Sequence, residues 1–331
     1  MYLVSLLLVF FISLFILNNS FKIGKYLNII DYPNKRKLNT KKAVKIGSIF
    51  FIFPVLAILF EIYLNQNLLN IEFISFIFIL FSFFMIGFVD DSISLSATKK
   101  ILLYFIIIFI FIKLNPKYEI NSLNFYLFET KDIKNISIYF TCFCIISLIV
   151  ALDLMDGINL TTGIFLLSKL LLIYFIFEKT IFDKHLILLL IFPLILFLFF
   201  NAIGKVYLGT GGTCILALFI SLIIIHKANN YPNLLSATHI LALLLIPGLD
   251  MIRVFLIRFF KNGKIFTPDK RHLHHLMENK YGVMRTISIL SLIFISTDLT
   301  IIYFYDLVYY IILLEILIFF TILKVCSKSF K

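Results

Sequence analysis

Three of the chain's six histidines lie in one basic stretch, Pro268-Asp269-Lys270-Arg271-His272-Leu273-His274-His275. Arg, Lys and His side chains grouped in this way form a cationic pocket that suits phosphate or diphosphate. The spacing of the three histidines could also ligate zinc, but no cysteine or other strong fourth ligand accompanies them. We therefore predict that Arg271, His272, His274 and His275 bind a phosphorylated substrate, with a solvated basic loop as the alternative.

Four aspartates form two further candidate groups. Asp90 and Asp91 end a long apolar run and are followed by Lys100. Adjacent carboxylates repel each other, so they need a cation, a metal or water, and at the carboxyl end of a helix they also oppose its dipole. Asp153 and Asp156 lie between two apolar runs and would share one face of a helix. Because ionisable groups near membrane depth are costly and usually functional, we favour a site for a magnesium-bound diphosphate over a solvated helix end or a polar turn.

A glycine-rich stretch is a weaker candidate. It contains Gly204-Lys205 and, four residues later, Gly209-Thr210-Gly211-Gly212. Glycines beside a lysine allow backbone N–H groups to approach phosphate, but the spacing is not that of a P-loop. A plain glycine turn explains the stretch equally well. Farther along the chain, Asp250 and Arg253 are three residues apart and could pair on a helix.

Long apolar runs separate these polar groups. Hydrophobic residues make up 61% of the chain and charged residues 15%, against about 25% charged residues in soluble domains. Apolar runs such as 71–89 and 286–303 are long enough to cross about 30 Å of hydrocarbon as helices. We predict an all-α polytopic integral membrane protein with one transmembrane domain over residues 1–331, a retained first helix, and no disulfide framework among its four cysteines. The eleven expected spans are 2–17, 46–64, 71–89, 101–114, 136–152, 160–177, 185–200, 213–226, 237–250, 286–303 and 305–323.

The distribution of the 30 Lys and Arg residues predicts the topology. Most of them fall in the loops on one side of the expected spans, and the positive-inside rule makes that side cytoplasmic. The N-terminus is then outside and the C-terminus in the cytoplasm. The net charge of +12 reflects this topology, so we expect no nucleic-acid partner. The basic loop 18–45 could also serve only to contact anionic lipid. The loops expected to form the site are 18–45, 90–100, 153–159, 201–212 and 251–285.

Taken in order, these patterns resemble the motifs of the polyprenyl-phosphate sugar-1-phosphate transferases, glycosyltransferase family 4. That family includes UDP-N-acetylhexosamine transferases that initiate surface polysaccharides and the phospho-N-acetylmuramoyl-pentapeptide transferase of peptidoglycan. The resemblance extends from Asp31 to His275, with the Asp90-Asp91 motif intact and Lys100 behind it. The sequence His-Leu-His-His resembles the hexosamine-1-phosphate branch. The other matching positions are Pro33, Arg36, Lys37, Gly47, Pro247, Asp250, Arg253, Pro268, Asp269, Arg271, His272 and His274, whereas Lys42, Val44 and Ser48 depart from the first motif.

The resemblance implies transfer of a sugar 1-phosphate, by default N-acetylhexosamine 1-phosphate, from a UDP-sugar to undecaprenyl phosphate, with release of UMP. It implies a multi-pass enzyme of the bacterial inner membrane with Mg²⁺, or alternatively Mn²⁺, at a site that faces the cytoplasm. The product would initiate an O-antigen, capsule or teichoic-type polymer, and a homodimer is one expected assembly. The implied catalytic residues are Asp90, Asp91, Asp156, His272, His274 and His275, and the implied substrate-binding residues are Arg36, Lys37, Lys100, Lys205 and Arg271.

The implied metal site departs from the family pattern. Where the family has asparagine and aspartate ligands, this chain has Asp153 and Thr210. Magnesium prefers hard, anionic oxygen ligands. We hypothesise that the carboxylate has moved across the site to Asp153, so that the pair still supplies one carboxylate and one neutral oxygen. The alternatives are a weakened or inactive family member and a lipid-linked sugar carrier; an isoprenoid diphosphate enzyme is disfavoured because the third aspartate of its D-D-x-x-D motif is missing.

Overall fold

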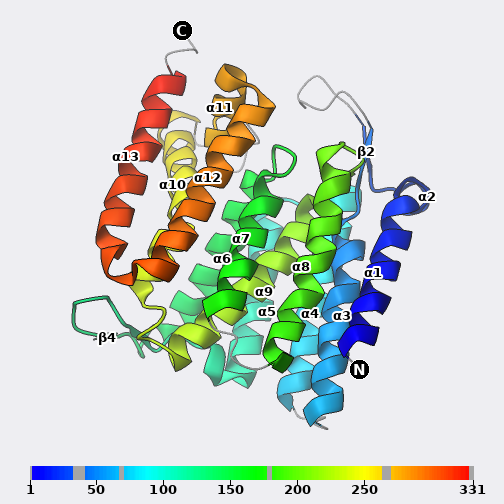
Figure 1. Cartoon of the computed structure of the whole chain (residues 1–331), viewed down its shortest axis with the longest axis horizontal. Helices are drawn as coiled ribbons and strands as arrows, with labels where there is room; N and C mark the ends of the chain where they lie inside the picture. Colours follow the sequence, from blue (N-terminus) through cyan, green and yellow to red (C-terminus); the bar gives the residue numbers. More distant parts are fainter. Residues whose placement is uncertain (1, 33–41, 67–70, 177–180, 263–269, 328–331) are drawn as a thin grey trace.

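The computed structural model describes residues 2–32, 42–66, 71–176, 181–262 and 270–327. Over these residues the chain is all-α, a bundle of helices whose two termini lie at opposite ends (Figure 1). The helices are α1 (Tyr2–Asn18), α2 (Ser20–Tyr26), α3 (Gly47–Gln66), α4 (Ile71–Ile93), α5 (Ala97–Leu114), α6 (Ser137–Met155), α7 (Thr161–Ile176), α8 (Ile181–Ala202), α9 (Gly209–Asn230), α10 (Ala237–Asn262), α11 (Leu273–Tyr281), α12 (Val283–Tyr303) and α13 (Val308–Ser327).

Each of the eleven expected spans lies mostly within a helix of its own. In the described parts of the chain, eight helices are long and apolar enough to cross a membrane, or nine if the bent pair α1 and α2 forms one span. The two other expected spans correspond to α7, which has only 16 residues, and to α5, which carries three lysines. The chain is therefore a multi-pass membrane protein with eight or nine clear spans, and its orientation remains a prediction.

Several helices extend beyond their expected ends into the predicted loops. Helix α4 continues through Asp90 and Asp91, and α6 continues through Asp153. Helix α10 has 26 residues, about 39 Å at 1.5 Å per residue, which exceeds a hydrocarbon layer of about 30 Å. Its polar end therefore projects from the membrane or the helix tilts. The predicted loop 251–285 is in large part helical, since α11 and the start of α12 also fall within it.

Short strands lie at both ends of the bundle (Figure 1). Strand β2 (Ala43–Lys45) pairs antiparallel with β1 (Ile30–Asp31) and parallel with β5 (Val206–Tyr207). This sheet ties the segment after α2 to the segment before α9. At the opposite end, β3 (Ser122–Leu123) and β4 (Lys131–Asp132) form a hairpin.

Helix α9 is the most buried of the eight clear spans and packs against α3, α4 and α6. Its first turn lies in very close contact with two neighbours. A Cβ atom on Gly87 of α4 would lie 2.3 Å from Gly211 Cα, and one on Gly211 would lie 2.3 Å from Ser48 Cβ of α3. Only glycine permits this approach, which brings the carboxyl end of α4 to the amino end of α9.

Candidate active site

Two carboxylates bind the amino end of α9. Asp91 accepts hydrogen bonds from the N–H groups of Thr210 (3.1 Å) and Gly211 (3.0 Å), and Asp156 accepts one from the N–H of Gly209. The first N–H groups of a helix lack partners within the helix, and its dipole favours negative charge at this end. The glycine-rich stretch is therefore a helix start whose N–H groups already bind protein carboxylates.

Asp156 follows the last residue of α6 and lies next to two other carboxylates. Burial raises its pKa to about 8, with further contributions from Asp153 and Asp91, against the opposing effects of the Gly209 N–H and Lys45. A carboxyl group in this environment holds a proton at neutral pH much more readily than an exposed one. Asp156 thus lies beside Asp153 and Asp91, and it also binds the amino end of α9.

Lys100 links the two remaining aspartates. Its Nζ atom lies 3.0 Å from Asp90 Oδ2 and 3.5 Å from Asp153 Oδ2. Asp90 also accepts the N–H of Leu95 at 2.7 Å, a contact that fixes the turn between α4 and α5. The side chain of Asp153 is 29% exposed, against 9% for Asp90. Asp153 is therefore the more open member of a pair of carboxylates that shares one cation.

The hydroxyl partners of these carboxylates differ from the expected ones. The Thr210 side chain bonds to Asp90, whereas the hydroxyl nearest to Asp153 belongs to Thr213, with Oγ1 3.4 Å from Asp153 Oδ1. Sequence reasoning did not assign a role to Thr213. Its signal was the helical spacing, because three residues after Thr210 lie on the same face.

The donor set suits a hard divalent cation. Among the described residues no three His, Cys, Asp or Glu side chains are grouped as a metal site. Magnesium, however, is usually held by one or two carboxylates together with substrate phosphates. Asp90 and Asp153 already share one positive charge, that of Lys100. The residues therefore fit a magnesium ion that arrives with a diphosphate.

His272 has partners on both ring nitrogens. Its Nδ1 atom lies 2.9 Å from Asp250 Oδ2, and its Nε2 atom lies 3.3 Å from a guanidinium nitrogen of Arg258. Asp250 also accepts the N–H of Leu273 at 2.9 Å and a guanidinium N–H of Arg253 at 2.7 Å. The predicted pairing of Asp250 with Arg253 is thus present. His272 lies where α11 begins and is held there by α10.

His274 and His275 lie against the end of α6. Their ring centroids are 4.2 Å apart, and a Cβ atom on Gly157 would lie 2.4 Å from His274 Nε2 and 2.8 Å from His275 Cε1. His274 is buried, and its Nε2 has no hydrogen-bond partner among the described residues. Burial lowers the pKa of His274 well below its usual value, and His275 lowers it further. His274 is therefore a neutral imidazole near Asp156, and its Nε2 atom is available for a hydrogen bond to a ligand.

Of the other predicted substrate-binding residues, the structure describes Lys205 and Arg271. Lys205 is exposed, with Nζ 5.7 Å from the centre of the Phe200 ring, and no described contact joins it to the aspartates. Arg271 precedes His272 and accepts a hydrogen bond from Arg253 through its carbonyl oxygen. Arg36 and Lys37 lie outside the described residues.

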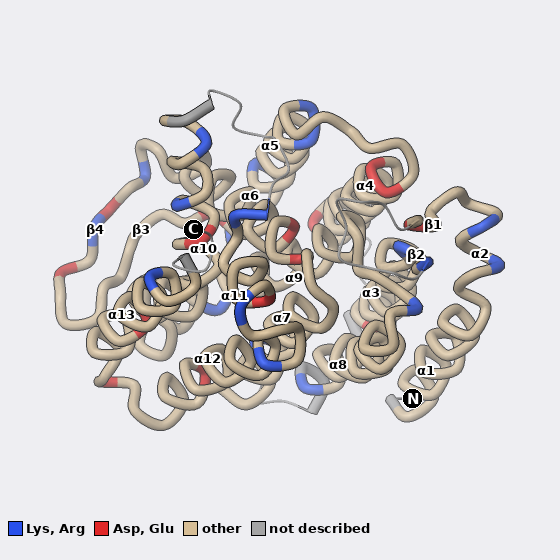
Figure 2. The backbone as a smooth tube through the Cα atoms, turned by 90° about the horizontal axis from the view of Figure 1, so that it is seen from above, with Lys and Arg blue, Asp and Glu red and all other residues tan. Residues whose placement is uncertain are grey.

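Sequence reasoning did not select Lys45 as a site residue. Its Nζ atom lies 3.8 Å from Asp91 Oδ1, and it also acts on Asp156. The signal was its position two residues before Gly47, within the first motif of the resemblance. Viewed from above, basic residues of α5 and β2 lie beside acidic residues of the neighbouring helices (Figure 2).

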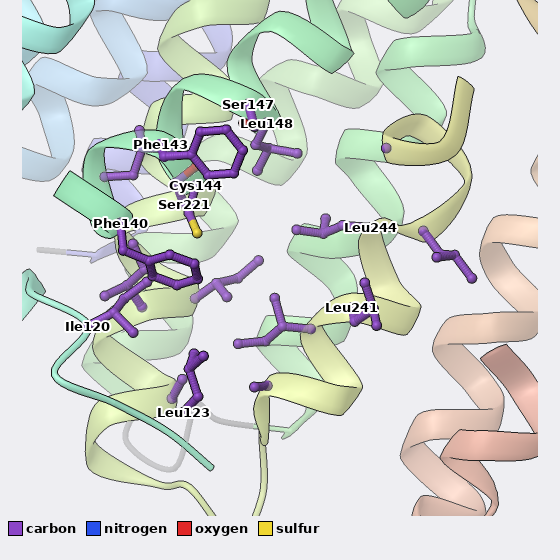
Figure 3. Close-up of a pocket in the computed structure, with 18 of the residues that line it drawn as sticks. Ile120, Leu123, Phe140, Phe143, Cys144, Ser147, Leu148, Ser221, Leu241 and Leu244 are labelled. Atoms are coloured by element: carbon purple, nitrogen blue, oxygen red, sulfur yellow. The ribbon is translucent and has the colours of Figure 1, made fainter. Parts of the chain in front are cut away.

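An apolar cavity of about 540 Å³ reaches this end of the bundle. It lies between α6 and α10, with residues of α9 in its wall, and Phe143, Leu148 and Leu244 point into it (Figure 3). It begins near the β3–β4 hairpin and continues to Ala151 and Met251. Because these two residues precede Asp153 and follow Asp250 closely in the chain, the cavity ends beside the polar site.

Comparison with known proteins identifies a matching family and two similar proteins. Residues 73–228 match the model of the family described as glycosyl transferase family 4. The chain is 25% identical over 300 residues to the "Probable undecaprenyl-phosphate N-acetylglucosaminyl 1-phosphate transferase" of Bacillus subtilis (strain 168), covering 89% of this chain and 81% of that protein. It is 32% identical over 170 residues to the "Phospho-N-acetylmuramoyl-pentapeptide-transferase" of Prochlorococcus marinus (strain MIT 9312), covering 47% and 46%. Over residues 73–228 the chain with this site is therefore similar to glycosyl transferase family 4, and its similarity to the Bacillus subtilis protein extends over 89% of the chain.

Proposed function

We propose that the protein transfers N-acetylhexosamine 1-phosphate from a UDP-sugar to undecaprenyl phosphate and thereby initiates a cell-envelope polysaccharide. The observation that carries the proposal is the meeting of three features at one end of the bundle. These are the carboxylate pair Asp90 and Asp153 around Lys100, the histidine pair on α11, and the apolar cavity between α6 and α10.

The apolar cavity suits the lipid acceptor. Its walls are almost entirely hydrocarbon, and one end lies beside Asp153. A polyprenyl chain would be stabilised in the cavity because its hydrocarbon would contact apolar walls and remain out of water. With the polyprenyl chain in the cavity, the phosphate of the lipid would lie at the level of Ala151 and Met251, next to the polar site.

The polar site suits a nucleotide diphosphate. Asp90 and Asp153, with Thr213 beside them, would hold Mg²⁺, which would neutralise charge on the diphosphate oxygens. The Nε2–H of neutral His274 would donate a hydrogen bond to a phosphate oxygen. Arg271, just before α11, and His275 on α11 would hold the same group. His272 would position α11 through Asp250 and Arg258.

In the proposed reaction an oxygen of the lipid phosphate attacks the sugar-bearing β-phosphorus. The new P–O bond forms as the bond from that phosphorus to the bridging oxygen breaks, and the bridging oxygen leaves with UMP. A phosphate monoester is largely ionised near neutral pH, so no strong base is needed. Transfer of this kind depends on positioning and on neutralising charge. Asp91 and Asp156 would contribute by fixing α9 against α4 and α6.

The test is a reaction with purified protein in lipid nanodiscs that contain undecaprenyl phosphate and Mg²⁺. A panel of UDP-N-acetylhexosamines, including 6-deoxy sugars, is supplied in separate reactions. We expect UMP and a lipid diphosphate sugar from at least one donor, and neither product without the lipid phosphate. Protein that is folded by size-exclusion chromatography but gives no UMP with any donor would contradict the proposal and favour an inactive family member.

A further inference from the structure

Three ionisable side chains meet inside the helix bundle, apart from the candidate active site. They are Lys169 on α7, Asp298 on α12 and Glu315 on α13, with exposed fractions of 1%, 5% and 4%. Asp298 and Glu315 belong to clear membrane spans, where ionisable groups are costly and are kept only with partners. None of the three belongs to a motif that predicts the transferase activity.

Lys169 and Asp298 form an ion pair. The ammonium group contacts Asp298 Oδ1 and lies 4.9 Å from the centre of the Phe165 ring. A carboxylate and an aromatic face both stabilise an ammonium group that has lost its water. The pair joins α7 to α12.

Glu315 has a different kind of partner. Its Oε1 atom contacts the hydroxyl of Thr297, and that hydroxyl also lies 3.0 Å from the carbonyl oxygen of Ile293. A hydroxyl carries one hydrogen. If Thr297 donates that hydrogen to Ile293, as is usual within a helix, its oxygen can bind Glu315 only as an acceptor. An ionised carboxylate has no hydrogen to donate, whereas a protonated carboxylic acid has one.

The net charge of the cluster also indicates that Glu315 is protonated. Two carboxylates and one ammonium group leave one uncompensated negative charge in a region of low dielectric constant. In addition, the second oxygen of Glu315, like that of Asp298, has no hydrogen-bond partner among the described residues, but only Asp298 contacts the ammonium group of Lys169. A buried atom without a partner costs less free energy when its group is neutral than when it is charged.

From these contacts we propose that Glu315 is a proton-binding site inside the membrane domain. Glu315 is a neutral acid whose O–H donates a hydrogen bond to the Thr297 hydroxyl oxygen, while Lys169 and Asp298 are both charged. The whole cluster is then neutral. It fastens α13 to α12 by a neutral hydrogen bond and α12 to α7 by an ion pair.

The same amide substitution at the two acids tests the assignment. Glu315→Gln keeps the shape of the protonated acid and its donor to Thr297, so we expect an unchanged melting temperature in detergent and an unchanged size-exclusion profile. Asp298→Asn leaves the buried Lys169 ammonium without its counter-charge, so we expect a melting temperature lower by several degrees. A fall in melting temperature for Glu315→Gln as large as that for Asp298→Asn would overturn the proposal.

Infrared spectroscopy gives a second readout that does not depend on the stability of Asp298→Asn. The difference spectrum of wild type minus Glu315→Gln at neutral pH should contain the carbonyl stretch of a protonated carboxylic acid, shifted in D₂O. The matched control is Glu72→Gln, because the Glu72 side chain is 43% exposed and paired with Lys117. Its difference spectrum should contain carboxylate bands only. Loss of carboxylate bands in Glu315→Gln as well would show that Glu315 is ionised.

Discussion

The four aspartates at the candidate site differ in what their charge binds. Asp91 and Asp156 hold N–H groups of α9, so their oxygens stabilise a helix end. Asp90 and Asp153 instead share the ammonium group of Lys100. Asp153 is the more exposed of this second pair. It is therefore the carboxylate best placed to release the ammonium group of Lys100 and to bind a metal ion that arrives with the substrate.

Replacement of Asp153 by Asn should therefore lower kcat for UMP release by about 100-fold or more, the usual size of losing one charge-stabilising group. The melting temperature should change little, because the side chain is partly exposed. A wild-type kcat in Asp153→Asn would contradict the idea that the metal carboxylate has moved to this position.

The double variant makes the same test in the opposite direction. Thr210→Asp alone places a third carboxylate beside Asp90 and Asp153. Neighbouring negative charges repel each other, so the kcat of this variant should fall too. In the double variant Asp153→Asn/Thr210→Asp the site again has one carboxylate and one neutral oxygen at these positions. We expect it to recover most of the wild-type kcat in the same UMP assay. Two additive losses would rule out exchange of the charge between the two positions.

The neutral state of His274 predicts a pH dependence of stability. Its pKa is lowered in the folded protein, first by burial, whereas in the unfolded chain it titrates near 6.5. Below that pH the unfolded chain binds a proton that the folded protein does not, so the free energy of unfolding falls as the pH decreases. We expect the melting temperature to drop between pH 7.5 and pH 5.5, and to drop less in His274→Gln. Equal drops in both proteins would show that His274 is not the group responsible.

At the scale of helices, the sequence predicts which segments are helical better than it predicts where each helix begins and ends. All eleven apolar runs are helical, and the polar stretches near Asp91, Asp153 and His274 do meet at one end of the bundle. The helix ends were missed because they depend on contacts that are distant in the sequence. Helix α9 begins at Gly209 because Asp91 of α4 and Asp156, just after α6, bind its first N–H groups. Local pattern alone could not distinguish this helix start from a phosphate-binding turn.

The close contact of α3, α4 and α9 gives a prediction at this scale. Gly211→Ala would place a Cβ atom 2.3 Å from Ser48 Cβ and 3.1 Å from Asp91 Oδ2, so α9 must shift away from both. Overpacking of this kind costs about 1–3 kcal/mol of stability, and we expect a lower melting temperature and slower UMP release. The control is Gly248→Ala in α10, where a Cβ atom would meet nothing within 4 Å and alanine favours the helix by up to about 1 kcal/mol. Equal melting temperatures for the two variants would refute the role of the glycine contact.

At the scale of the whole molecule, the two proposed substrates reach one site from two different phases. The polar residues lie at the end of the bundle that carries α11 and β2 (Figure 1), where a nucleotide sugar would arrive from water. The apolar cavity between α6 and α10 continues from that end toward the β3–β4 hairpin, along the direction in which a lipid chain lies in a membrane. A change inside the cavity should then affect one substrate and not the other.

Leu244→Trp should make that separation visible. Leu244 points into the cavity (Figure 3), and the larger indole would fill space that the polyprenyl chain needs. We expect the KM for undecaprenyl phosphate to rise roughly tenfold or more, a loss of about 1.4 kcal/mol in binding, while the KM for the UDP-sugar stays the same. Leu292→Trp, at a side chain that is 68% exposed on α12, makes the same change in size outside the cavity and should alter neither constant. An equal rise in both KM values for Leu244→Trp would mean that the substitution disturbs the polar site itself and that the cavity does not hold the lipid.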